Sequence, residues 1–130
     1  MTHTIPAYDL QNVRLNYGRI NVLNIDHLTI ESGTITGLVG PNGSGKSTLL
    51  KLLAFCLKPA CGTILYNGKK EYCFSPAVRS KITLLTQSPC LLKRTVFENV
   101  AYGLKIRNDR ADLDQRVSTA LMGVGLAPEA

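Results

Sequence analysis

A glycine-rich segment followed by a lysine and two hydroxyl residues has the residue types and spacing of a chemical site. It runs from Gly40 to Thr48 with the sequence GPNGSGKST, which fits the pattern G-x-x-x-x-G-K-[ST] of a phosphate-binding loop. Glycines lack Cβ, so they let the main chain approach phosphate oxygens closely. Successive N–H groups of such a loop form an anion-binding concavity. The segment therefore predicts binding of a polyphosphate and its Mg²⁺.

The side chains at the end of this loop have separate expected roles. Lys46 should contact the β- and γ-phosphates through its ammonium group. Ser47 should ligate Mg²⁺ through its hydroxyl oxygen, and Thr48 is placed to donate to an inner phosphate. The residues expected to bind nucleotide here are Gly40, Asn42, Gly43, Ser44, Gly45, Lys46, Ser47 and Thr48. The alternative is a glycine-rich turn that precedes a lysine by chance, which is rare for so long a match.

The segments on either side of the loop have the patterns of a strand and a helix. Residues 34–39 (TITGLV) are mostly apolar and contain β-branched residues, so they predict a buried strand. Leucines recur at helical spacing from Leu49 to Leu57, so a helix should begin near Lys46 and end before Gly62. Strand, loop and helix in this order are the context that the motif requires.

Alternating and turn-forming patterns predict further strands. Residues 8–17 and 27–31 alternate apolar and polar side chains, which favours two antiparallel strands joined by a turn at 18–21. Residues 63–66 and 69–73 flank Asn-Gly, a strong hairpin signal. Residues 82–86 (ITLLT) predict another buried strand.

Three helical segments are also predicted. Residues 76–80 fit one helical turn. Residues 95–104 begin with Thr95 and place Glu98 three residues on, which is the pattern of a capping box. The last helix carries its apolar residues on one face, and Gly125 ends it. Asp109 or Asp112 is placed to cap the start of this helix. The residues of its apolar face are Leu113, Val117, Ala120, Leu121 and Val124.

Composition favours one globular domain and excludes several classes of protein. The chain has 130 residues, of which 45% are hydrophobic and 18% charged, enough for one hydrophobic core. It has neither a membrane-spanning apolar run nor a secretory leader, so a cytoplasmic protein is expected. The net charge is +6, and the basic residues are scattered along the sequence rather than gathered in one stripe. This distribution only weakly favours nucleic-acid binding. The four cysteines lack C-x-x-C spacing, so reduced thiols are expected rather than a zinc site.

Three segments together resemble the ATP-binding subunit of ABC transporters. Residues 37–50 (GLVGPNGSGKSTLL) look like its Walker A motif, residues 84–89 (LLTQSP) like its Q-loop, and residues 95–104 (TVFENVAYGL) like a segment of many importers. The resemblance implies an α/β P-loop NTPase core with an N-terminal antiparallel β subdomain. Residues 1–130 would form a partial nucleotide-binding domain that ends at the start of the helical subdomain. The resemblance also implies that ATP and Mg²⁺ are the ligands. It implies a transmembrane permease and a second ATP-binding subunit as partners, and no nucleic-acid partner is expected.

The same resemblance assigns two residues outside the loop. Tyr17 sits where the family places its adenine-stacking aromatic residue, and such stacking contributes about 1–3 kcal/mol. Its alternative is an aromatic side chain in the core at the end of a strand. Gln87 would reach Mg²⁺ or the attacking water through its amide oxygen, and its alternative is an ordinary loop amide. Residues 88–95 resemble the region that touches the permease.

Motifs that ATP hydrolysis requires in this family are not found in the 130 residues. There is no LSGGQ sequence, no apolar run ending in Asp-Glu and no histidine after His27. We therefore expect a fold truncated before the signature motif and the Walker B strand. This chain alone should be inactive as an ATPase, and its uncovered apolar faces should make it marginally stable.

Three functions remain open from the sequence. The first is an ABC transporter ATPase subunit at the inner face of the cell membrane, which imports a small oxyanion such as tungstate. That cargo is suggested by residues 52–55 (LLAF) and 95–104. The second is a nucleotide-binding fragment without turnover. The third is a soluble ABC-type ATPase that acts on nucleic acid or the ribosome, which the basic charge permits.

Overall fold

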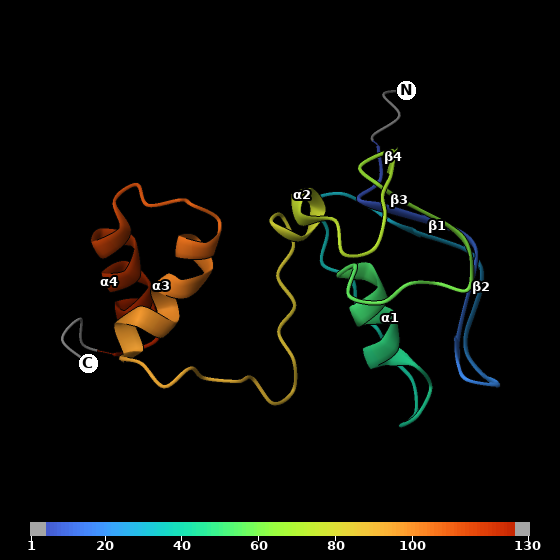
Figure 1. The fold of residues 1–130 in the computed structure, drawn as a ribbon, viewed down its shortest axis with the longest axis horizontal. Helices are drawn as coiled ribbons and strands as arrows, with labels where there is room; N and C mark the ends of the chain where they lie inside the picture. Colours follow the sequence, from blue (N-terminus) through green and yellow to red (C-terminus); the bar gives the residue numbers. More distant parts are fainter. Residues whose placement is uncertain (1–4, 127–130) are drawn as a thin grey trace. The chain divides into compact units, whose positions relative to one another are not determined.

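The computed structural model describes residues 5–126 and divides the chain into two compact units, residues 1–84 and 85–130. Figure 1 draws both, and each unit is described by itself. The first unit holds the sheet, the glycine-rich loop and the helix after it. The second unit holds two helices.

The sheet of the first unit has four strands in the order β2-β1-β3-β4, and each neighbouring pair is antiparallel. These strands are β1 (Tyr8–Tyr17), β2 (Ile20–Ile30), β3 (Cys61–Tyr66) and β4 (Lys69–Lys70). The predicted antiparallel pairing and the hairpin at Asn67-Gly68 are confirmed, but β2 is longer than the predicted 27–31 and β4 is shorter than the predicted 69–73. The predicted turn at 18–21 is wrong in its length, because β2 already begins at Ile20 and pairs there with Tyr17.

A close approach between β1 and β3 requires glycine at position 62. The register of this pair shifts between Gln11 and Arg14, and Asn12 lies in the left-handed region with φ 52°. Gly62 has φ 94°, and a Cβ there would lie 2.5 Å from the Asn12 carbonyl oxygen. An L side chain would clash with main-chain atoms, so only glycine fits this bulge.

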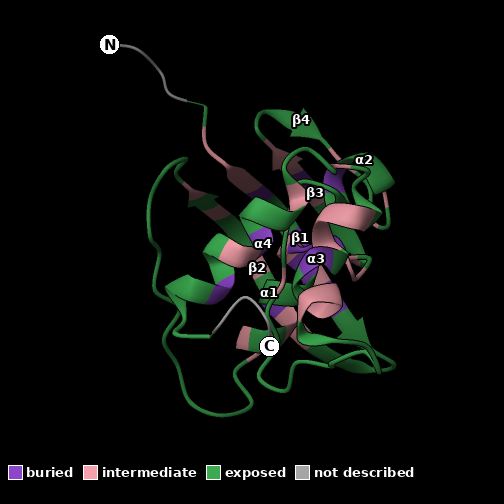
Figure 2. Cartoon of the chain, turned by 90° about the vertical axis from the view of Figure 1, so that its left-hand side faces the viewer, coloured by how far each residue is buried: buried purple, intermediate pink, exposed green. Residues whose placement is uncertain are grey.

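The core of the first unit lies between the sheet and helix α1 (Lys46–Leu53). Figure 2 marks the buried residues of these elements in purple. Phe55 is fully buried and has φ 55°, so the chain turns there and α1 ends at Leu53, earlier than the leucine pattern predicts. The buried members of this core are Leu10, Val13, Leu15, Leu23, Leu49, Leu52, Phe55, Ile64 and Val78. Val78 comes from α2 (Pro76–Arg79), the predicted helical turn.

Two predicted buried strands are wrong. Residues 34–39 and 82–86 form no strand in the structure. Ile35 and Val39 are 104% and 94% exposed, and Leu85 is 79% exposed. A strand needs a hydrogen-bonded neighbour, and within residues 5–126 no strand pairs with either segment. Their apolar pattern therefore indicates β propensity, but residues 5–126 contain no neighbouring strand that would pair with these segments and bury their side chains.

The second unit contains α3 (Val96–Ile106) and α4 (Leu113–Gly123). The predicted capping box is confirmed, since the Glu98 amide donates to Thr95 Oγ1 at 3.1 Å and the Thr95 amide donates to Glu98 Oε2 at 3.1 Å. Ala101, Val117 and Leu121 form the buried contact between the helices. Val124 is 73% exposed, so the predicted apolar face of the last helix does not extend that far.

The predicted cap of α4 is only partly present. Asp112 occupies the N-cap position, but its side chain makes no capping hydrogen bond there. Asp109 instead accepts a hydrogen bond from Arg116 at 3.0 Å. Among residues 5–126, no helix has the length and apolarity needed to cross a bilayer.

Candidate phosphate-binding site

Two glycines shape the loop between residues 40 and 48. Gly43 and Gly45 have φ 82° and 88°, a region that favours glycine. At Gly45 a Cβ would also lie 2.9 Å from Leu23 Cδ2 and 3.1 Å from the Val22 carbonyl oxygen. Gly45 therefore lets the loop rest directly against β2, and α1 begins at the next residue.

The start of α1 offers a positive electrostatic end. Gly45 caps the helix without a side-chain hydrogen bond, and the first turn contains no acidic residue. The first N–H groups of a helix have no partner within it and carry a partial positive charge. Ser47 is exposed and Thr48 is half-buried in this turn. An anion at this position would meet main-chain donors and no carboxylate from the helix.

The Lys46 side chain folds back over the loop. Its Nζ donates to the carbonyl oxygens of Gly40 and Pro41, each at 2.6 Å. It also lies 3.4 Å from Ser44 Oγ. Hydrogen bonds to an anion are shorter and stronger than those to a neutral carbonyl. A phosphate group at the loop can therefore compete for the same ammonium group.

A cavity of about 250 Å³ adjoins the loop. Its polar side is the loop itself, and its apolar wall includes Leu23, Leu38 and Leu49. A Cβ at Gly40 would lie 2.8 Å from Ser44 Oγ, so glycine keeps this part of the loop narrow. A second hollow of about 500 Å³ runs along residues 22–28 and shares Leu23, Ser44 and Leu49 with the first.

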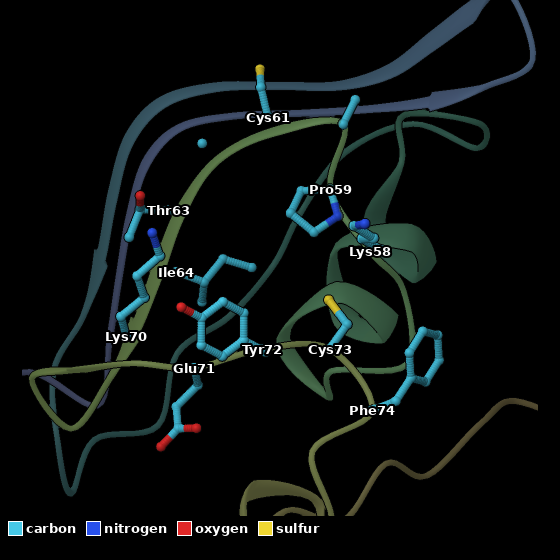
Figure 3. Close-up of a pocket in the computed structure, with 12 residues that line it drawn as sticks. Lys58, Pro59, Cys61, Thr63, Ile64, Lys70, Glu71, Tyr72, Cys73 and Phe74 are labelled. Atoms are coloured by element: carbon cyan, nitrogen blue, oxygen red, sulfur yellow. The ribbon is translucent and has the colours of Figure 1, made fainter.

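A different cavity of about 530 Å³ lies between β3 and residues 70–74 (Figure 3). None of its lining residues belongs to the loop. The Cys73 thiol beside it donates to the Leu57 carbonyl oxygen at 2.7 Å, and burial raises the pKa of this thiol. Lys58 and Lys70 also line this cavity, but its lining holds neither a glycine-rich loop nor the start of a helix, so it lacks the main-chain donors that make residues 40–48 suitable for phosphate.

Tyr17 and Gln87 occupy different units of the structure. Tyr17 ends β1 in the same unit as the loop and is 51% exposed, so its ring is not part of the core. Gln87 is exposed in the second unit. Residues 40–48 and Tyr17 therefore belong to one unit and Gln87 to the other.

The wall formed by β2 is the part of the site that sequence reasoning did not identify. Leu23 contributes to both hollows next to the loop and approaches Gly45 directly. Leu23 lies 17 residues before Gly40, between the predicted turn at 18–21 and the predicted strand at 27–31. The only sequence signal was its apolar character, which is typical of many core residues.

Comparison with known proteins identifies the family of this chain. The family model described as ABC transporter matches residues 23–129. The chain therefore belongs to the ABC transporter family, and its fold contains the P-loop NTPase motif next to an antiparallel sheet.

Two curated relatives match most of the chain. The tungstate uptake system ATP-binding protein TupC of Peptoclostridium acidaminophilum is 40% identical over 118 residues, which are 90% of this chain and 53% of the relative. The probable iron export ATP-binding protein FetA of Escherichia coli (strain K12) is 34% identical over 113 residues, 86% of this chain and 50% of the relative. The chain thus spans about half the length of these relatives.

A solved structure has the same fold over most of the described chain. A bacterial Atm1-family ABC exporter with ATP bound aligns with a TM-score of 0.69 and 28% identity, and the match covers 78% of this chain and 18% of the exporter chain.

Proposed function

We propose that this chain provides the N-terminal part of the ATP-binding subunit of an ABC transporter and that residues 40–48 bind ATP. The observation that carries the proposal is the loop geometry. The loop contains two glycines with positive φ, Gly43 and Gly45. It leads into a helix whose first turn has no acidic residue, and the Lys46 ammonium group lies against the same loop. This donor set suits a chain of phosphates, because several N–H donors and one cation meet the charge together.

Mg²⁺ fits the same place through the Ser47 hydroxyl. Ser47 is exposed in the first turn of α1, and Mg²⁺ favours hard oxygen ligands while it keeps several waters. When bound, the ion would neutralise the β- and γ-phosphate oxygens. We propose Gln87 as a second contact to the ion or the attacking water, and Tyr17 as the residue that stacks on adenine.

We further propose binding without turnover for the 130-residue chain alone. Phosphoryl transfer needs a positioned water and charge stabilisation together with the phosphate site. The sequence supplies the lysine and one Mg²⁺ ligand but no Asp-Glu after an apolar strand. Hydrolysis would require a complete domain and a second ATP-binding subunit. We propose that the complete protein works with a transmembrane permease and lies at the inner face of the cell membrane.

The proposed cargo is a small oxyanion such as tungstate. The support is the relative named for tungstate uptake, which is 40% identical to this chain, whereas another relative is named for probable iron export. Accumulation of labelled tungstate by cells that carry the chain with its neighbouring permease genes would test this cargo. Export of iron by the same cells, without tungstate uptake, would contradict it.

Nucleotide binding is tested with a fluorescent ATP analogue and Mg²⁺. Lys46→Ala should weaken binding by about tenfold or more, because charge-assisted hydrogen bonds contribute about 1.5–3 kcal/mol each. Lys51→Ala is the matched control, since Lys51 lies on the same helix in its last turn. Equal affinity of the wild type and Lys46→Ala would overturn the proposed site. Steady phosphate release by the pure chain would overturn the proposal of binding without turnover.

A further inference from the structure

The cavity of about 530 Å³ between β3 and residues 70–74 has the size of a small-molecule site. We call it the β3 cavity (Figure 3). Ligand pockets commonly measure about 300–1,000 Å³ and have apolar walls with a few polar groups. All the residues that line the β3 cavity lie between Lys58 and Phe74. One continuous stretch of the first unit therefore builds this cavity.

Phe74 lies at the β3 cavity in a conformation that costs free energy. Its φ is 64°, in the left-handed region that a bulky residue rarely adopts. The Phe74 amide donates to the Phe55 carbonyl oxygen at 3.0 Å, which holds the main chain in place. The Phe74 side chain is nevertheless 57% exposed, so burial of the ring does not compensate for the strain. Residues strained in this way cluster at functional sites such as ligand clamps.

Tyr72 adds a second exposed aromatic ring to the lining of the cavity. Its side chain is 69% exposed, whereas Ile64, which also lines the cavity, is buried in the core. Aromatic rings offer large apolar faces that pack favourably against another ring. The lining therefore suits a planar apolar body.

Two lysines add positive charge to the β3 cavity. Lys58 and Lys70 are exposed and line it, and they lie on either side of Tyr72 in Figure 3. Within residues 5–126, no carboxylate forms an ion pair with either lysine. Glu71 also lines the cavity, but its side chain extends in the opposite direction to that of Lys70 (Figure 3). An anionic group on a ligand would therefore find charged donors that no acidic side chain occupies.

We propose that the β3 cavity binds a small planar aromatic carboxylate. The ring of the ligand packs against Tyr72 and Phe74, and its carboxylate accepts hydrogen bonds from the ammonium groups of Lys58 and Lys70. The cavity has no glycine-rich loop and no helix start in its lining, so a single carboxylate matches its donors better than a polyphosphate does. The site goes beyond the proposed ATP binding and shares no residue with 40–48.

The test titrates the 130-residue chain with 2-naphthoate and follows the main-chain amides by NMR. The matched probe is 2-naphthamide, which has the same ring system without the charge. Shifts should concentrate in residues 58–74, and 2-naphthoate should bind about fivefold or more tightly than 2-naphthamide, because only the anion makes charge-assisted hydrogen bonds.

The double variant Lys58→Gln/Lys70→Gln tests the source of that preference. It should bind the two probes with equal affinity, since it has lost both ammonium groups. Lys69→Gln is the control, because Lys69 neighbours Lys70 in β4 but does not line the cavity. This control variant should keep the preference for 2-naphthoate.

Phe74→Gly tests the strained aromatic residue. Glycine adopts a φ of 64° without strain, so the fold should be retained, and circular dichroism checks this. The variant should bind both probes about tenfold or more weakly, because the contact with the ring is lost. Tyr102→Leu, at a position that is 41% exposed in the second unit, is the control. Lys46→Ala should bind 2-naphthoate as the wild type does, which separates the β3 cavity from nucleotide binding.

Any one of four results would overturn the proposal. The first is that 2-naphthoate shifts no amide within residues 58–74. The second is that the wild type binds 2-naphthoate and 2-naphthamide equally. The third is that Lys58→Gln/Lys70→Gln retains the preference for the anion. The fourth is that Phe74→Gly, with its fold retained, binds both probes as tightly as the wild type.

Discussion

The side-chain amide of Asn99 and the main chain of Leu92 form a reciprocal pair of hydrogen bonds. Asn99 Oδ1 accepts from the Leu92 amide at 2.8 Å, and Asn99 Nδ2 donates to the Leu92 carbonyl oxygen at 3.1 Å. The same Nδ2 lies 3.2 Å from the Arg94 carbonyl oxygen and 2.9 Å from that of Thr95. One side chain thus fixes residues 92–95 to the start of α3, and these residues lie in the segment 88–95 that resembles the permease-contact region of the family.

We expect Asn99→Ala to loosen this turn. The change removes an acceptor and a donor that the main chain uses, and it should lower the free energy of unfolding of the second unit by about 1–2 kcal/mol. Exchange of the Leu92 amide should accelerate by about tenfold or more. Gln115→Ala, at an exposed position of α4, serves as the control. An unchanged Leu92 exchange rate in Asn99→Ala would contradict this role.

The capping box gives a second prediction. Thr95→Ala removes the oxygen that accepts from the Glu98 amide, so it should destabilise α3 by about 1 kcal/mol. Thr95→Ser keeps that oxygen and should retain most of the stability. Urea denaturation followed by helical circular dichroism measures both variants. Equal stability of the alanine and serine variants would show that the cap contributes nothing.

The bulge between β1 and β3 gives a third prediction. Gly62→Ala places a Cβ 2.5 Å from the Asn12 carbonyl oxygen at φ 94°, so it should destabilise the first unit by about 2–3 kcal/mol. Gly123→Ala lies in α4 with open space around its Cβ and should be neutral or slightly stabilising. Urea denaturation midpoints of the two variants should therefore move in different directions or by clearly different amounts.

Tyr8 makes stability depend on pH in the alkaline range. Burial raises the pKa of its hydroxyl from 10.0 to about 12, with a smaller contribution from Tyr66, and the hydroxyl donates to the Leu53 carbonyl oxygen at 3.1 Å. The folded state therefore favours the neutral phenol. This contribution is fully present below the unfolded pKa of 10.0 and is lost as the pH rises toward about 12.

Tyr8→Phe provides the measurement. The variant loses the hydrogen bond to Leu53 but has no hydroxyl to ionise. The free energy of unfolding of the wild type should fall more steeply than that of Tyr8→Phe between pH 10.0 and about 12. Tyr72→Phe, at a position that is 69% exposed, is the control and should follow the wild type. Parallel curves for the wild type and Tyr8→Phe would contradict the raised pKa.

Local patterns predicted the helices and hairpins well because their determinants lie within a few residues. The capping box joins Thr95 to Glu98, and the Asn67-Gly68 turn joins β3 to β4. Residues 34–39 and 82–86 show the limit of this approach. Their β-branched composition indicates strand propensity, but a strand also requires neighbours distant in sequence, and residues 5–126 supply none to either segment.

In the candidate site, too, the residues that are contiguous in sequence were predicted and the contacts between distant segments were not. The loop from Gly40 to Thr48 was predicted because its glycines and lysine follow one another in the chain. The contact of Leu23 with Gly45 was not, because it joins two segments that only folding brings together. Gln87 stays a prediction, since it lies in the second unit.

The Lys46 ammonium group has a consequence for affinity. Because it already donates to the Gly40 and Pro41 carbonyl oxygens, an incoming triphosphate must exchange these bonds for its own. The measured dissociation constant then reflects the difference between the two sets of bonds rather than the full strength of either. Small oxyanions in the buffer would compete for the same cation, so the strength of nucleotide binding should depend on which salt is present.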